Sequence, residues 1–467
     1  MPAPRRTAVL GATAAAAALA VAGAVALPSG SAEHVTVSKA AAAAAVGAGD
    51  TAPLSGVSFT LKSSPVSAAA LKQLDDTAAN PARGMKRQAD LVAAATGAKN
   101  GLVWKSGCGA NDAVKAMNAK LTVGAWCFAN GDKSSKYWIP QGVATSRTAQ
   151  LDGFVLSWYH RHLSGSDWVT DGSRLTVGKR PLVEKAGAYQ PVTLAIPTAT
   201  AAGKLAVKDV RPAAPAPGAA SAQGVADAPQ HQGGVALAGD YVYTADTSGL
   251  RVYDVRRTYQ VPTGKTGLGV DATDGKFYAH GEKYVLFQTG MYRPLNAGAC
   301  PAWDKAPSAK DKDLCFSTVT YDPTTSPKSL LTAEYKTGGG VTSAKPMRVV
   351  RWPLNADGSL QADASGQVKS MVVYGTNLTN VQGVAGYHGG GGDTIYYSTT
   401  LTAPGAFYSD RDGDGKAPFK IVGPIGGESL AFDPYSGGDR IYGITERPNQ
   451  RMFFWTYRKQ LQRPGMP

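Results

Sequence analysis

The sequence predicts an all-β protein, and more narrowly a β-propeller of about six blades, with five to seven blades compatible with its repeats. One short phrase recurs along the chain, and each copy opens an apolar run typical of a strand. A second apolar run follows each copy after 6 to 11 residues, so every copy begins a two-stranded unit. The four copies are Gln141-Gly142-Val143-Ala144, Gly233-Gly234-Val235-Ala236, Gln382-Gly383-Val384-Ala385 and Glu428-Ser429-Leu430-Ala431.

The spacing of the copies predicts the number of blades. Their starts lie 92, 149 and 46 residues apart, close to two, three and one multiples of a single period. A period of about 40 to 50 residues is typical of a four-stranded blade. Further hairpins fill the gaps, and the clearest runs from Gly239 to Val255 around Thr247-Ser248-Gly249. Because a proline-rich segment and an insertion between two cysteines use part of the length, we expect six blades.

The first 32 residues have the three parts of an export signal. Arg5 and Arg6 precede an apolar run, and Gly30-Ser31-Ala32 is a small-residue cleavage site. The run is long enough to span a bilayer, but it is mostly alanine, which favours a removed signal over an anchor. We therefore expect a signal peptide at 1–32 and a secreted protein with no membrane span in its mature form. Sec and twin-arginine export both stay open.

The remaining chain is predicted to have a leader, a helical part and a propeller. Helix starts are indicated where Ser64-Pro65, Asn80-Pro81 and Asn111 precede apolar residues at helical spacing. The expected parts are a flexible leader at 33–60, a small helical cap at 61–135, and a propeller at 136–467 with a Pro/Ala-rich loop at about 208–230.

The net charge is +14, or +12 after removal of Arg5 and Arg6 with the signal. The basic residues are scattered, which is typical of ordinary solvation, although attraction to an anionic surface stays open. The densest basic stretch, Arg451 to Arg463, is interleaved with aromatic residues and is better explained as a final strand than as a nucleic-acid groove. We expect a monomer with no nucleic-acid partner.

The four cysteines are expected to form two short-range disulfides. Cys108 would pair with Cys127, which would staple the helical cap, and Cys300 with Cys315. Each loop is short, so each bond should add about 3 kcal/mol by constraining the unfolded chain. A metal site is disfavoured because the chain has no CxxC spacing.

Residues 233–256 carry a resemblance to known proteins. The run Gly239-Asp240-Tyr241-Val242-Tyr243, followed by Gly249-Leu250-Arg251-Val252-Tyr253-Asp254-Val255, resembles the LVIVD/YVTN class of bacterial propeller repeats. Together with the signal and the Ala/Gly-rich composition, the chain resembles secreted propeller proteins of actinobacterial type. The resemblance implies the fold and not a reaction, because most such families have no assigned activity.

A calcium site is expected in the segment Asp410-Arg411-Asp412-Gly413-Asp414-Gly415. Carboxylates at alternate positions before a glycine form the first half of a calcium loop. The second half is missing, because Ile421 stands where an EF-hand needs a bidentate Glu. We expect a structural calcium bound by Asp410, Asp412, Asp414 and the backbone carbonyl of Lys416. The alternative is a solvated Asp/Gly turn.

A second candidate site lies where the proposed inner strands begin. If each phrase starts the innermost strand of a blade, one polar residue per blade converges on the central channel and could bind a small ligand or a metal. The alternative is that these residues bond only backbone groups and channel waters. The channel-lining residues are expected to be Gln141, His231, Gln232, Gln382 and Glu428.

No nucleophile elbow, His-Glu-x-x-His motif or phosphate loop occurs in the sequence. The sequence therefore favours an extracellular binding or scaffolding module, with a cell-wall polymer, a carbohydrate or another exported protein as partner. The alternative is a metal-assisted hydrolase or lyase of the lactonase or streptogramin-lyase kind, with Glu428 and His231 at a channel cation. His160 and His162 are a weaker metal-binding pair, if one strand carries both on the same side.

Overall fold

The fold was obtained as a computed structural model, and it confirms the all-β class. Strands dominate the described residues, and the two α-helices among them are short. All of these residues belong to one compact unit that extends from Ala42 to Pro467. The structure describes residues 51–98, 100–108, 113–129, 131–164, 167–180, 185–210, 232–295, 314–337, 341, 345–390, 392–400, 404–433 and 439–466.

Antiparallel pairing groups most strands into five sets, which we call sheets 1 to 5. Sheet 1 contains β6 (Trp138–Thr148), β7 (Leu151–Ser164), β8 (Asp167–Lys179), β9 (Gly187–Ala199) and β10 (Leu205–Asp209). Sheet 2 contains β11 (Val235–Ala238), β12 (Tyr241–Asp246), β13 (Gly249–Gln260), β16 (Tyr284–Pro294), β2 (Thr60–Pro65) and β20 (Gln367–Lys369).

The other three sheets follow the same plan, with each successive strand hydrogen-bonded to the one before. Sheet 3 contains β17 (Phe316–Asp322), β18 (Ser329–Glu334), β19 (Met347–Pro353), β21 (Val372–Thr376) and β1 (Ala52–Pro53). Sheet 4 contains β22 (Val381–Gly389), β23 (Gly392–Thr399), β24 (Ala406–Arg411) and β25 (Phe419–Val422). Sheet 5 contains β26 (Gly427–Asp433), β27 (Arg440–Thr445), β28 (Met452–Tyr457), β5 (Val123–Phe128) and β4 (Asn100–Trp104).

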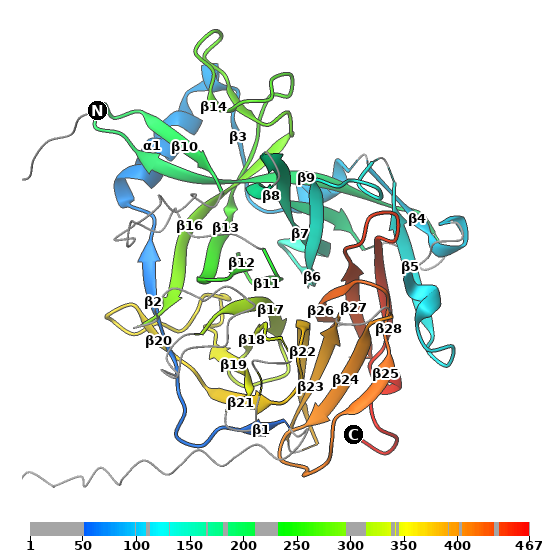
Figure 1. The fold of residues 1–467 in the computed structure, drawn as a ribbon. Helices are drawn as coiled ribbons and strands as arrows, with labels where there is room; N and C mark the ends of the chain where they lie inside the picture. Colours follow the sequence, from blue (N-terminus) through cyan, green and yellow to red (C-terminus); the bar gives the residue numbers. More distant parts are fainter. Residues whose placement is uncertain are drawn as a thin grey trace, which may run out of the picture. The chain divides into compact units, whose positions relative to one another are not determined.

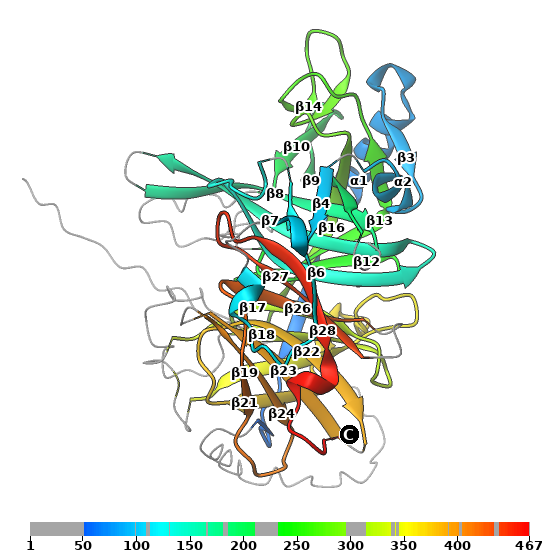
Figure 2. The same cartoon turned by 90° about the vertical axis from the view of Figure 1, so that its right-hand side faces the viewer.

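The remaining elements lie at the outer strands. Strand β9 also pairs with β4 of sheet 5 and, in parallel, with β16 of sheet 2, so it links three sheets. Both α-helices contact β9 (Figure 2). No helix in the described parts of the chain is long and apolar enough to cross a membrane. These elements are β3 (Lys86–Gln88), β14 (Leu268–Val270), β15 (Phe277–Ala279), α1 (Ala68–Ala79), α2 (Val92–Thr96) and the 3-10 turns Pro81–Arg83, Lys105–Gly107, Ala113–Ala116 and Arg458–Leu461.

The first strands of the five sheets, β6, β11, β17, β22 and β26, are the inner strands. They surround a common centre (Figure 1), and each contacts the next in chain order. The last contacts the first, where the Thr145 hydroxyl of β6 donates to the Phe432 carbonyl of β26 at 3.3 Å. The five sheets therefore close into a ring.

Glycines let the inner strands approach one another closely. A Cβ added to Gly142 would lie 2.5 Å from the backbone N of Val235, and one added to Gly383 would lie 2.5 Å from the carbonyl O of Glu428. Real Cβ atoms do not come this close to backbone. Glycine is thus required here by the neighbouring strand, as expected where two backbones meet.

The four phrases found in the sequence are at the starts of β6, β11, β22 and β26, and the expected range of five to seven repeats includes the number of inner strands that the described residues contain. Within the described residues there are five inner strands. The fifth, β17, begins with Phe316-Ser317-Thr318 and lacks the glycine of the phrase. The sheets are also unequal in length, because β7 and β8 have 14 and 13 residues whereas β22 and β23 have 9 and 8. A single period therefore divides the chain wrongly.

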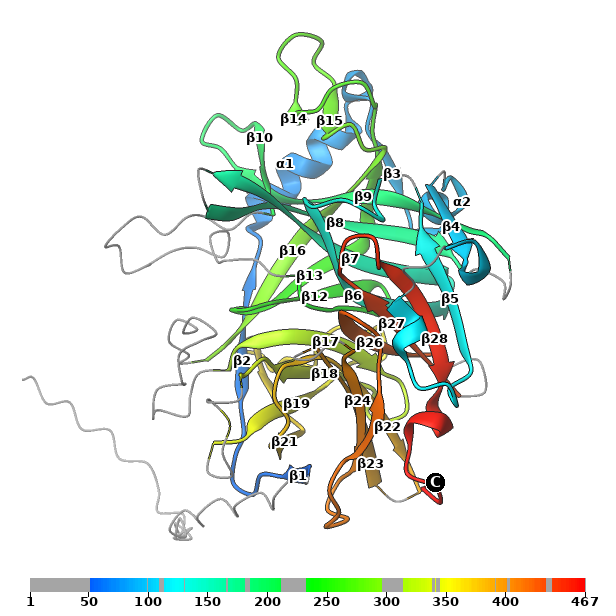
Figure 3. The ribbon, with the colours of Figure 1, turned by 45° about the vertical axis from the view of Figure 1, so that its right-hand side comes forward.

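The amino-terminal expectations need correction. Residues 51–60 are not a flexible leader, because Thr51 is buried, β1 forms an edge of sheet 3, and β2 starts at Thr60. Residues 61–135 are not a separate helical cap. Of the three expected helices, only α1 is a full helix, capped by the Ser67 side chain. The rest supplies outer strands, and β5 lies along β28 of sheet 5 (Figure 3).

The other boundary predictions fall partly outside the described residues. The signal peptide at 1–32, most of the leader and residues 211–230 of the Pro/Ala-rich loop are not described. The Cys108–Cys127 disulfide is confirmed and joins the end of the β4 segment to β5. Cys315 is also in a disulfide, and Cys300 lies outside the described residues.

The ring predicts that Gly142→Ala destabilises the fold. The new methyl group would meet backbone atoms of the β11 segment that cannot move independently, so we expect a loss of about 1 to 3 kcal/mol in the free energy of unfolding. Urea denaturation measures this. Gly267→Ala is the matched control, since a Cβ there meets nothing within 4 Å. Equal stability of the two variants would contradict the close approach of the inner strands.

Candidate functional site

The amino-terminal ends of the inner strands share an irregularity that turns side chains out of the regular ladder. In β6, β17, β22 and β26 the ladder skips a residue, so two residues face one on the partner strand. Before β11, Gly233 donates to the Ala245 carbonyl at 3.0 Å while Gly234 accepts from the Ala245 amide at 3.1 Å. Such bulges redirect a side chain locally. The extra residues are Gln141, Ser317, Gln382 and Glu428 with Ser429.

These ends meet one another at the centre of the ring. Gly142 packs on the backbone at Gly234 and Val235, and Gly383 packs on the backbone at Glu428. The Thr318 and Ser429 hydroxyls, from sheets 3 and 5, lie 3.3 Å apart. We call the polar residues Glu428, Glu446 and Gln141 at this end the axial site.

Glu428 is the most unusual residue of the axial site. Its side chain is 1% exposed, and neither carboxylate oxygen has a hydrogen-bond partner among the described residues. Burial, and then the negative charge of Glu446, raise the pKa of Glu428 well above its ordinary value. A buried carboxylate without a donor is costly when ionised, so it is protonated, hydrated or paired with something the protein does not itself supply.

Gln141 and Glu446 complete the axial site. The Gln141 amide nitrogen donates to Glu446 Oε2 at 3.2 Å and to the Pro140 carbonyl at 3.1 Å. Its amide oxygen is buried and has no partner in the described part of the chain. Burial raises the pKa of Glu446, and the bond from Gln141 and the nearby arginines offset only part of this. The atoms left without partners by Gln141 and Glu428 are therefore all hydrogen-bond acceptors.

A buried arginine binds the backbone of Glu446. Arg451 is fully buried, and its guanidinium donates to the carbonyls of Glu446 and Asp132, each at 2.7 Å. Burial lowers the pKa of Arg451 to about 10. The pKa of Tyr159 is raised by burial and then by Glu446 and Glu428, so both carboxylates act electrostatically on this hydroxyl. No arginine contributes to the raised pKa of Glu428, which is caused by burial and by the charge of Glu446.

The other residues expected to line the channel do not all join the axial site. Gln232 is fully buried, with φ +50°, and its side chain lies by the Tyr253 hydroxyl in sheet 2. Gln382 is half-buried. His231 lies outside the described residues. The structure thus brings together Gln141 and Glu428 from the sequence prediction and places Gln232 in a neighbouring polar interior.

An aromatic cluster lies on the strands that carry Gln141 and Tyr159. The Tyr137 ring stacks with His160 at a centroid distance of 6.1 Å, and Trp138 lies 4.8 Å from the same imidazole. The Arg174 guanidinium covers the Trp138 ring at 4.3 Å. Tyr137 is 52% exposed, which leaves one ring face available to solvent. His160 and His162 do not alternate simply along β7, because a bulge separates His160 from Arg161.

The expected calcium residues have separate partners. Asp410 is buried and accepts from the backbone amide of Thr51. The Asp414 carboxylate accepts from the Lys416 amide at 2.8 Å, which closes the turn. Burial, then Asp393, raise the pKa of Asp412. Across the described ranges, no group of three or more His, Cys, Asp or Glu side chains could hold a metal ion.

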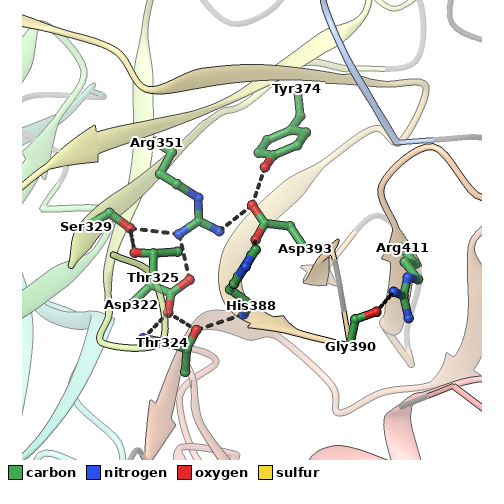
Figure 4. A network of polar contacts seen from close by, with 10 residues as sticks. All are labelled: Asp322, Thr324, Thr325, Ser329, Arg351, Tyr374, His388, Gly390, Asp393 and Arg411. Carbon is green, nitrogen blue, oxygen red and sulfur yellow. Dashed lines mark hydrogen bonds and ion pairs between the residues drawn. The ribbon is translucent and has the colours of Figure 1, made fainter. Parts of the chain in front are cut away.

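A second buried charge network joins sheets 3 and 4 (Figure 4). Arg351 pairs with Asp322 at 2.6 Å and with Asp393 at 3.0 Å, and Tyr374 donates to Asp393. Burial alone would raise the pKa of Asp393, but Arg351, Tyr374 and His388 hold it below its ordinary value. His388 lies 2.7 Å from Asp393 through Nδ1. Because each carboxylate here has a cation, the network is a structural link between sheets.

A cavity of about 160 Å³ lies near the opposite ends of three inner strands. It is lined by Thr145, Ser146 and Thr148 at the end of β6, by Leu237 and Gly239 at the end of β11, and by residues of β17 and of the loops of sheet 3. The Ser146 and Thr148 hydroxyls bond each other at 3.1 Å. None of the residues expected from the sequence lines this cavity.

The sequence prediction missed Glu446 and Arg451. Glu446 follows β27, the second strand of sheet 5, and the two strands are antiparallel. The end of a second strand therefore lies beside the start of its inner strand. A polar residue directly after each second apolar run is the signal that could have identified Glu446.

No protein-family model matches the chain, and no curated protein is similar to it in sequence. The function must therefore be inferred from the geometry of the site.

The axial site predicts that Glu428→Gln stabilises the protein at neutral pH. A carboxyl whose folded pKa is raised loses stability as pH rises from its unfolded pKa, near 4.5, toward the folded value. Within that pH range, the free energy of unfolding of the variant should rise relative to that of the wild type by up to about 1.4 kcal/mol per pH unit. Denaturation at pH 4 and pH 7.5 without divalent cations measures the difference.

Glu334→Gln is the matched control with the opposite sign. Glu334 is equally buried, but Arg348 and Lys336 overcome the effect of burial and lower its pKa. Its stabilising charge is present above the unfolded pKa and is lost as pH falls, so this variant should be destabilised at pH 7.5 and less so in acid. A Glu428→Gln variant that is also destabilised at pH 7.5 would contradict this prediction. It would show that groups of the protein already stabilise the ionised carboxylate of Glu428.

Proposed function

We propose that the protein is a secreted β-propeller of five blades, sheets 1 to 5, that acts as a binding module. Its ligand site is the axial site, and its ligand is a carbohydrate polymer of the cell exterior. The propeller assignment is supported by the ring of five inner strands, each of which begins its own run of antiparallel strands, although β9 joins sheets 1, 2 and 5 at their outer strands. The first 32 residues, with their export-signal pattern, support secretion.

The observation that carries the binding function is the buried, unpartnered carboxylate of Glu428 at the meeting point of the inner strands. A site that only stabilises the fold would pair such a group, as Arg351 pairs Asp322 and Asp393. A polar group left without a partner at a point where several strands converge is what a ligand site requires. The bulges add to this, since they are enriched next to functional sites.

The exposed aromatic ring of Tyr137 favours a carbohydrate among polar ligands. Sugar rings present both C–H faces and hydroxyl edges, so they suit a flat aromatic ring next to polar groups. Tyr137 directly precedes β6, and Gln141 lies in the same strand. The ring stacks with His160, which in turn contacts Trp138, and this limits the entropy lost on binding.

A metal-assisted hydrolase or lyase is the second candidate. It is favoured by the two carboxyls with raised pKa values, Glu428 and Glu446, because perturbed carboxyls often transfer protons at active sites. Glu428 would be the first residue to suspect, with His231 as the second. Turnover of a lactone that is lost in Glu428→Gln would favour this function over binding alone.

The binding function predicts that insoluble peptidoglycan or a cell-wall polysaccharide retains the purified chain in a sedimentation assay. Tyr137→Ser should weaken retention about tenfold, in line with the loss of about 1 to 2 kcal/mol from one aromatic contact. Glu428→Gln should weaken it as well.

Val422→Ser is the control, because this exposed apolar residue lies on the outer strand of sheet 4 and its loss should leave retention unchanged. No retention of the wild type, or equal retention of all three variants, would contradict the proposal. Retention only by another exported protein would replace the carbohydrate with a protein partner.

A further inference from the structure

The unpartnered polar atoms of the axial site have the same chemistry. Both oxygens of Glu428 and the amide oxygen of Gln141 are buried acceptors without a donor among the described residues. Gln141 cannot exchange the roles of its amide atoms without losing the bond from its nitrogen to Glu446. The site therefore lacks a positive or hydrogen-donating partner, and it does not lack an acceptor.

The nearby arginines do not supply this partner. Arg451 donates to two backbone carbonyls through Nε and Nη1, its Nη2 is buried without a partner among the described residues, and its charge acts on Glu446 and not on Glu428. The pKa of Glu428 is raised by burial and Glu446, with no cation acting on it. Glu428 is buried and Glu446 is half-buried, and two neighbouring carboxyls repel each other when both are ionised, unless a cation lies between them.

We infer that the axial site binds one divalent cation of the calcium class through the oxygens of Glu428, Glu446 and Gln141. This inference rests on the proposed function, since it assigns the composition of the same ligand site. The donor set consists of carboxylate and amide oxygens without sulfur or imidazole, which suits calcium better than a transition metal. Calcium also accepts water and substrate hydroxyls in its remaining positions, which links the ion to a carbohydrate ligand.

The axial site offers a calcium ion more unpartnered oxygen ligands than the turn at Asp410–Asp414 does. There, Asp410 accepts from Thr51 and Asp414 accepts from Lys416, so these carboxylates already have partners. The axial site has two carboxylates, and its third ligand is an amide oxygen, so it differs from a cluster of three or more His, Cys, Asp or Glu side chains, of which the described residues contain none that could hold a metal ion. Substitutions at the axial site and at the Asp410–Asp414 turn can therefore be compared in the same protein to locate the ion.

The experiment is a calorimetric titration of the full-length, EDTA-treated chain with calcium chloride, together with thermal unfolding with and without calcium. We expect one site with a dissociation constant of about 10⁻⁴ to 10⁻³ M, typical of extracellular calcium modules, and a higher Tm with calcium. Glu428→Gln and Gln141→Leu should each weaken binding at least tenfold. The double variant Asp412→Asn, Asp414→Asn should bind as the wild type does.

Loss of binding in Glu428→Gln cannot be ascribed to unfolding if, as expected, this variant is at least as stable as the wild type without calcium. No binding to the wild type at about 10 mM calcium, ten times the weakest affinity expected, would overturn the inference. So would calcium binding that depends on Asp412 and Asp414 and not on Glu428.

The outcome is separable from that of the proposed function. Absence of calcium binding together with Glu428-dependent retention by peptidoglycan would reject the ion and keep the carbohydrate site. Glu428-dependent calcium binding without retention by any cell-wall polymer would support the ion and reject the carbohydrate.

Discussion

Closure of five sheets around one centre is the constraint on which the rest of the structure depends. Neighbouring inner strands must bring their backbones into contact, and at Gly142, Gly234 and Gly383 no side chain fits between them. The ring is closed by contact between β26 and β6, the last and the first of the inner strands along the chain. Outer strands taken from the amino-terminal segment, β1, β2, β4 and β5, then complete sheets 2, 3 and 5.

The same closure creates the axial site. Where backbones meet this closely, the ladders of sheets 1, 3, 4 and 5 are interrupted, and two of the bulged residues, Gln141 and Glu428, belong to the axial site. The protein treats its buried charges in two ways. Arg351 and Arg348 neutralise carboxylates in sheets 3 and 4, whereas Glu428 receives no such partner. The unpaired carboxylate of Glu428 lowers the free energy of unfolding, and such a loss of stability is common where a site serves binding.

The sequence predicted the class, the inner strands and part of the site because these depend on local pattern. The repeated phrase identified four of the five inner strands, and the glycine that three of its four copies carry marks close contact of backbones. β17 was expected as a strand but not as an inner strand, because Thr318 replaces that glycine, and the repeat number was predicted only as a range because hairpins of unequal length do not share one period. The prediction of a helical cap was wrong because Asn80-Pro81 starts only a single 3-10 turn before β3. Glu446 was missed because its place depends on long-range pairing.

The central claim is that Glu428 lies buried where the inner strands meet and that its partner comes from outside the protein. The most direct measurement is a crystal structure of the chain grown with calcium. The account predicts density for an ion at about 2.3 to 2.6 Å from oxygens of Glu428, Glu446 and Gln141, inside a ring of five inner strands. A Glu428 carboxylate that accepts hydrogen bonds from a protein donor, with no ion beside it, would contradict the account.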